Sequence, residues 1–107
     1  MRAQLGFHVE FSILPVTVLV DPRTRQFAYD GPDVADFVFR WIDFIERTNL
    51  QSGGGGSPGG WDFFVTTAET SRRRNCIELD RQRVLGWLRG QPEVTFAMVG
   101  PLVDAGE

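Results

Sequence analysis

The sequence contains no lysine and only one cysteine, and these shortages exclude several kinds of chemistry. All eleven cationic residues are arginine, so a Schiff-base lysine and a P-loop lysine are absent. Cys76 alone can form neither an intramolecular disulfide nor a cysteine-based zinc site. Because small secreted domains are commonly stabilised by paired cysteines, the sequence favours a reducing compartment, the cytoplasm.

Long apolar runs are missing as well. No stretch approaches the ~20 apolar residues that a membrane-spanning helix needs. Residues 1–6 lack the charged start and the apolar stretch of a signal peptide. We therefore expect no membrane association.

A large charge excess is also absent. With 107 residues, of which 42% are hydrophobic and 23% charged, the chain is expected to form a single domain over residues 1–107. Its net charge of −3 argues against a protein that coats nucleic acid, which requires a dominant positive field. A nucleic-acid partner is therefore not favoured, although a local basic patch is compatible with this charge.

The clearest strand pattern lies near the start of the chain. Residues 4–14 alternate in hydropathy, with Phe7 and Val9 on one face and His8 and Glu10 on the other. A period of two residues is typical of a strand that buries one face and exposes the other.

Further strands follow from β-branched and aromatic runs between turn residues. Residues 16–20 and 26–29 predict a hairpin, with a turn that begins at Asp21. Three more strands are expected over residues 61–67, 75–79 and 94–99.

Two helices are expected between these strands. The first carries an apolar stripe at helical spacing, made of Val34, Phe37, Val38, Trp41, Ile42 and Ile45. The second has Asp80 as its N-cap and ends at Gly90. Gly86 inside it costs helix stability, which indicates a closely packed neighbour. The order β-ββα-ββα-β with short turns predicts a small α+β domain, with a mainly antiparallel sheet and both helices on one face.

The segment 51–60 reads QSGGGGSPGG and has no hydropathy pattern. Such a composition is typical of a flexible coil. We therefore expect a flexible glycine-rich loop inside the domain at residues 51–60.

Candidate catalytic groups are few and poorly matched. His8, Glu10 and Ser12 share one strand face, where side chains run parallel instead of converging. Cys76 has only His8 as a conceivable base, and the acidic residues of the first helix form no cation-binding motif. We expect no catalytic residue, no metal site and no cofactor, although carboxylate chemistry stays open.

Phe39 is the residue that the predicted fold explains least. It lies about 140° from Val34 on a helical wheel, away from the apolar stripe, and an exposed aromatic side chain suggests a binding surface. The expected protein-binding site comprises Phe39 with the charged residues around it, Asp36, Arg40, Asp43 and Arg47. On this basis we expect a protein–protein interaction domain (adaptor, regulator, inhibitor or assembly module) whose partner is a protein or a second copy of the chain.

An arginine cluster supports a competing function. Six of the eleven arginines lie between residues 72 and 89. Arginine clusters bind phosphate groups and nucleic acids. The alternative is therefore a nucleic-acid or phosphate-binding module that uses the turn 72–74 and the helix 81–89, with Arg72, Arg73, Arg74, Arg81 and Arg83 as the anion-binding residues.

Overall fold

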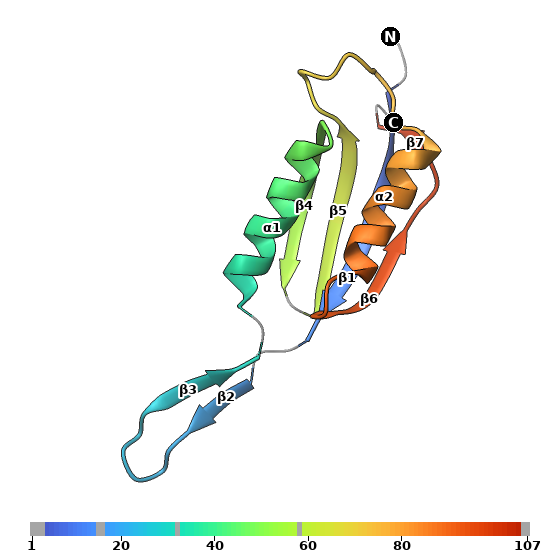
Figure 1. Ribbon diagram of the computed structural model, residues 1–107. Coiled ribbons are helices and arrows are strands. Elements are labelled where there is room, and N and C mark those ends of the chain that lie inside the picture. The colour runs from blue at the N-terminus through green and yellow to red at the C-terminus, as the bar shows by residue number, and fades with distance from the viewer. Residues whose placement is uncertain (1–3, 15–16, 32, 58, 106–107) are drawn as a thin grey trace.

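A computed structural model describes residues 4–14, 17–31, 33–57 and 59–105. It contains a five-stranded antiparallel sheet, two helices and a separate two-stranded hairpin (Figure 1). Val16 of the predicted second strand and the prolines at positions 32 and 58 lie outside the described residues. In chain order the elements are β1 (Leu5–Ile13), β2 (Thr17–Val20), β3 (Phe27–Asp30), α1 (Val34–Arg47), β4 (Leu50–Ser57), β5 (Gly60–Thr67), α2 (Glu78–Arg89), β6 (Val94–Val99) and β7 (Val103–Asp104).

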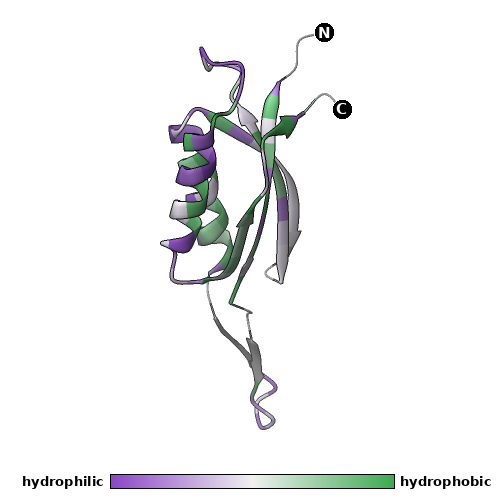
Figure 2. Ribbon diagram, turned by 90° about the vertical axis from the view of Figure 1, so that its right-hand side faces the viewer, coloured by the Kyte–Doolittle hydropathy of each residue, from purple (hydrophilic) through white to green (hydrophobic). Residues whose placement is uncertain are grey.

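The sheet has the strand order β4-β5-β1-β6, and β7 pairs with the first residues of β1. Every pairing is antiparallel, and both helices cover the same face of the sheet (Figures 1 and 2). Apart from the β2–β3 hairpin and the short β7, the chain follows a split β-α-β-β-α-β arrangement. The predicted fold class, a small α+β domain with an antiparallel sheet and two helices, is confirmed.

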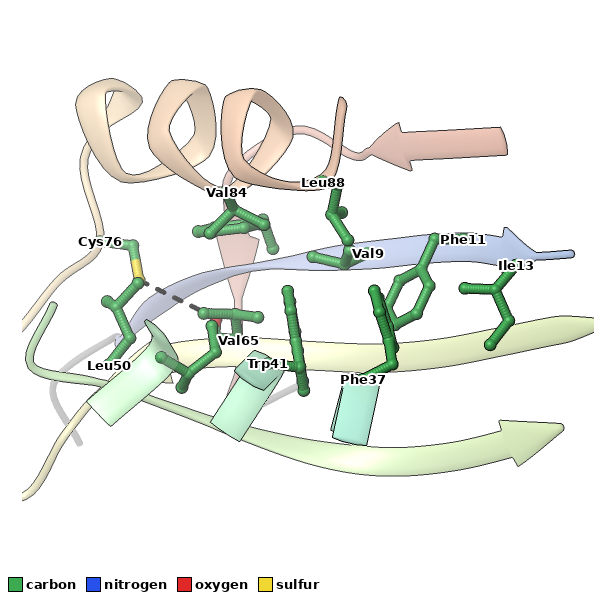
Figure 3. Packing of buried hydrophobic residues seen from close by; sticks show 12 residues of the cluster. Val9, Phe11, Ile13, Phe37, Trp41, Leu50, Val65, Cys76, Val84 and Leu88 are labelled. Carbon is green, nitrogen blue, oxygen red and sulfur yellow. Dashed lines mark hydrogen bonds between the residues drawn. The ribbon is translucent and has the colours of Figure 1, made fainter. Parts of the chain in front are cut away.

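Strand β1 lies at the centre of the sheet and supplies much of the core. Phe7, Val9, Phe11 and Ile13 are buried, whereas His8 and Glu10 are exposed on the opposite face. The alternation that predicted this strand therefore also gives its orientation. Its apolar face points toward the helices, as Figure 3 shows for the residues labelled there.

Helix α1 buries a narrower stripe than its sequence predicts. Phe37, Trp41 and Ile45 are buried, but Ile42 is 42% exposed. On the side toward α2, the ring of Phe44 stacks on that of Trp87 with 5.0 Å between centroids. Ile42, two residues from Phe44, lies on nearly the opposite side of the helix and faces away from this contact.

The prediction of a loop at residues 51–60 is wrong, because Leu50–Ser57 forms the edge strand β4. Gly54 lies opposite Phe63 and Gly56 opposite Trp61. Glycine has no side chain that could reveal a strand pattern, so at residues 53–56 the pairing with β5 is made by the backbone. Gly54 and Gly56 have φ angles of 138° and 154°, which few other residues adopt.

The expected strand at residues 75–79 is also wrong, because α2 begins at Glu78. Residues 75 and 76 do approach β1, but through isolated bonds. The Leu5 N–H donates to Asn75 Oδ1 at 2.8 Å, and the Cys76 N–H donates to the Leu5 carbonyl at 3.0 Å. Asp80 is the third residue of the helix and not its N-cap, and its carboxylate accepts the Ile77 N–H at 2.8 Å.

The β2–β3 hairpin forms a sheet of its own and projects from one end of the body (Figure 1). The described molecule consequently measures 63 × 24 × 21 Å. The predicted turn is present, because Asp21 accepts the Arg25 N–H with its carbonyl and the Arg23 N–H with its carboxylate, both at 2.8 Å.

Candidate functional site

The outer face of α1 carries the residues predicted to bind a protein. Phe39 is 72% exposed. It is flanked by two ion pairs of the helix, Asp36–Arg40 and Asp43–Arg47, each with a nitrogen–oxygen distance of 2.9 Å. The structure thus brings the five predicted residues onto one helix, with Phe39 among them as an uncovered aromatic side chain.

Arg40 also has a role inside the fold. Its guanidinium donates to Gln91 Oε1 and to Glu93 Oε2, which joins α1 to the segment after α2. The hydrogen bond to Glu93 raises the pKa of Arg40. Arg40 is therefore partly committed to internal contacts, and Arg47 is the more accessible cation of this face.

Two of the predicted anion-binding arginines hold the fold together. Arg73 donates two hydrogen bonds to the carboxylate of Asp80, at 2.8 and 3.0 Å. The Asp80 side chain is only 2% exposed. Burial by itself raises the pKa of Asp80, but the hydrogen bonds from Arg73 and the Ile77 N–H outweigh it, so the pKa is lowered.

Arg81 is the second of these structural arginines. It donates to the carbonyls of Gly100 at 2.6 Å and Val99 at 3.2 Å, and it pairs with Glu78 at 2.6 Å. It therefore fastens α2 to the end of β6. That Arg73 and Arg81 bind anions stays a prediction, but the structure gives both side chains internal partners, of which Asp80 and the carbonyls of Val99 and Gly100 were not evident from spacing alone.

A different set of residues forms the exposed side of α2. Arg83 and Arg89 are exposed, and within the part of the chain that the structure describes neither makes an ion pair. Gly86 lies between them, three residues from each, and a Cβ built there would have no atom within 4 Å. The packing neighbour expected at Gly86 is thus absent among the described residues. We call Arg83, Gly86 and Arg89 the arginine face of α2. The sequence had indicated Arg83 as an anion-binding residue and Arg89 as part of the helix 81–89, but had not connected Gly86 with them.

The sheet face away from the helices has the opposite character. The strands of the five-stranded sheet contain no arginine, and Glu10 and Asp62 are exposed on this face. His8 packs edge-on against Phe64 with 4.8 Å between ring centroids. Ser12 donates its hydroxyl to the carbonyl of Gly59 at 3.1 Å, so it is not aligned with His8 for catalysis. This face is acidic and partly apolar, with Phe96 and Met98 exposed.

The lone cysteine is buried against β5. Cys76 is 1% exposed, and its Sγ lies 3.9 Å from the carbonyl of Val65. Burial raises the pKa of Cys76 to about 11, so the thiol is protonated and unreactive at neutral pH. Over the described residues, no three His, Cys, Asp or Glu side chains gather as a metal site.

Together, the fold and these surfaces define a small α+β binding domain. Residues 3–106 match the family described as YggL 50S ribosome-binding protein, and the chain belongs to this family. No curated protein and no solved structure matches the chain. Among the described residues, no helix has the length and hydropathy of a membrane span.

The family corrects the expectation about the partner. A protein partner or a second copy of the chain was expected, with nucleic acid disfavoured. The family is described by binding to the 50S ribosomal subunit, an assembly of RNA and protein. The error came from the net charge, because a sum over the whole chain conceals how the arginines are segregated onto a few elements.

Proposed function

We propose that this chain binds the 50S ribosomal subunit in the cytoplasm, as a binding protein and not as an enzyme. The match to the ribosome-binding family over residues 3–106 carries this proposal. The exposed arginine face of α2 supports it, because RNA presents a dense array of phosphates.

The arginine face of α2 suits contact with an RNA backbone. Arg83 and Arg89 provide two cations without internal ion pairs among the described residues, and Gly86 leaves the helix surface bare between them. A bare backbone allows a ligand to approach closely, and guanidinium groups match phosphate geometry. Arg72, in the loop before α2, is exposed as well and extends the same type of surface.

The face around Phe39 is inferred to contact the same subunit. A phenylalanine that is 72% exposed forgoes about 1.5–3 kcal/mol of burial. The ion pairs of Asp36 and Asp43 hold the surrounding charges in place. Interfaces commonly combine such an apolar centre with a charged rim.

Cosedimentation tests this function. The purified chain is expected to travel with isolated 50S subunits, and not with 30S subunits, through a sucrose gradient. Binding should weaken as salt rises, with a log–log slope that falls by about one for each phosphate contact removed. The variant Arg83→Gln/Arg89→Gln is therefore expected to bind more weakly and with a shallower slope.

A charge-matched control separates the arginine face from net charge. Gln51→Glu/Thr95→Glu also lowers the net charge by two, but at exposed positions of β4 and β6. We expect it to bind like the wild type. A wild-type chain that does not cosediment with 50S subunits contradicts the proposed function, whereas equal losses in both variants contradict only the role of the arginine face.

A further inference from the structure

The β2–β3 hairpin is an element that the rest of the described fold does not use. Its strands pair only with each other, in a sheet separate from the five-stranded one. Figure 1 shows it extending away from the body. An isolated two-stranded hairpin is marginally stable in water, and Val20 on this hairpin is 56% exposed. Such an element gains stability when a partner surrounds it.

The tip of the hairpin carries positive charge. Arg23 and Arg25 are both exposed, with Thr24 between them. The nearby carboxylate of Asp21 already accepts the backbone N–H of Arg23 at 2.8 Å. Both arginines lie in the turn beyond the strand residues Thr17–Val20, which span about 13 Å from the base of the hairpin.

Arg25 also adopts a conformation that arginine rarely takes. Its φ is 58°, in the left-handed region, which costs a non-glycine residue free energy. The bond from the Arg25 N–H to the Asp21 carbonyl, at 2.8 Å, fixes the turn in this shape. The tip is thus a defined turn that presents two arginines, and not a run of exchangeable loop residues.

We propose that the β2–β3 hairpin is an arm that inserts into ribosomal RNA of the 50S subunit, with Arg23 and Arg25 bound to phosphates. This inference rests on the proposed function, and adds that the β2–β3 hairpin makes the contact and that RNA phosphates are the groups it binds. Charge complementarity selects RNA as the occupant: the exposed cations lie at the end of a narrow element that can enter a groove between RNA helices. The acidic sheet face lacks this complementarity, because the strands of that sheet contain no arginine.

A photo-crosslinker on the tip tests the arm directly. In the variant Thr24→Cys a thiol-directed benzophenone attaches to the tip, because Cys76 is buried and its pKa is raised to about 11. Irradiation of the labelled chain bound to 50S subunits is expected to yield crosslinks to ribosomal RNA. The wild-type chain, treated with the same reagent, should yield no crosslinks. Crosslinks to ribosomal protein alone, or no crosslink from a bound chain, would overturn the inference.

Affinity provides a second measurement. Arg23→Gln/Arg25→Gln is expected to bind 50S subunits at least about tenfold more weakly than the wild type, since each charged hydrogen bond to phosphate contributes on this scale. The control Gln51→Glu/Thr95→Glu has the same net charge and should retain affinity. If the wild type binds and the tip variant binds equally well, the proposal that the hairpin inserts into RNA is wrong, and the proposed function stands. If the wild type itself does not bind, the proposed function fails.

Discussion

The glycines of β4 differ in whether their positions leave space for a Cβ atom. A Cβ at Gly54 would lie 2.2 Å from the carbonyl oxygen of Asp62, and one at Gly56 would lie 2.2 Å from that of Gly60. At Gly53 and Gly55 a Cβ would have no atom within 4 Å. The pairing of β4 with β5 therefore requires glycine at positions 54 and 56, but not at positions 53 and 55.

Alanine substitutions should separate the two kinds of glycine. Gly54→Ala is expected to lower the free energy of unfolding by more than about 2 kcal/mol, because the methyl group collides with β5. Gly53→Ala, the neighbouring control, is expected to leave it unchanged or raise it by up to about 1 kcal/mol through reduced freedom of the unfolded chain. Urea unfolding measures both, and equal effects would mean that β4 is not paired as described.

Asp80 links stability to pH. Asp80→Asn is expected to cost about 1–3 kcal/mol at pH 7, because it removes the charged partner of Arg73 and weakens the bond to the Ile77 N–H. The pKa of Asp80 is lowered by folding. Its contribution is therefore complete above the unfolded pKa, near 4, and is lost as the pH falls below that value. Urea titrations at several pH values should show the wild type and the variant converging in acid; a constant difference would contradict this role.

At the scale of elements, one face of α1 packs in the core and the other carries Phe39, which is proposed to bind the subunit. Trp41→Ala is expected to lower the free energy of unfolding by about 3–5 kcal/mol, because Trp41 is buried among aromatic rings. Phe39→Asp, two residues away, should change it by less than about 0.5 kcal/mol but weaken cosedimentation with 50S subunits. Thermal unfolding and gradients measure the two effects, and a Phe39→Asp chain that unfolds would place Phe39 in the core.

Elements that pack one face on the core were predictable from the sequence, and the others were not. β1 and α1 show their burial as hydropathy periods, whereas β6 was predicted from its run of apolar and β-branched residues. β4 shows none, because glycines pair through the backbone and a period requires side chains. The segment before α2 is held by hydrogen bonds between Leu5 and residues 75 and 76, which lie far apart in the chain. Local pattern also predicted the β2–β3 hairpin, but not that it would stand apart from the sheet.

At the scale of the whole molecule, the candidate site too was predictable from the sequence only in part. The exposure of Phe39 follows from helix geometry alone and was predicted. The internal hydrogen bonds of Arg73 and Arg81 were not predicted, because Asp80 and the carbonyls of Val99 and Gly100 come close to these arginines only in the folded chain. The acidic sheet face and the basic α2 face likewise exist only after folding has sorted the charges.

The position of β1 in the sheet also governs when the domain can fold. β1 is synthesised before the other strands of the sheet, whereas its neighbours β5, β6 and β7 follow only after α1 and β4. Phe37 and Trp41 of α1 cover Phe11, but β1 stays without its strand partners β6 and β7 until residues 94–104 have been translated. Such distant pairings slow folding, so the sheet is completed only after both helices have been synthesised.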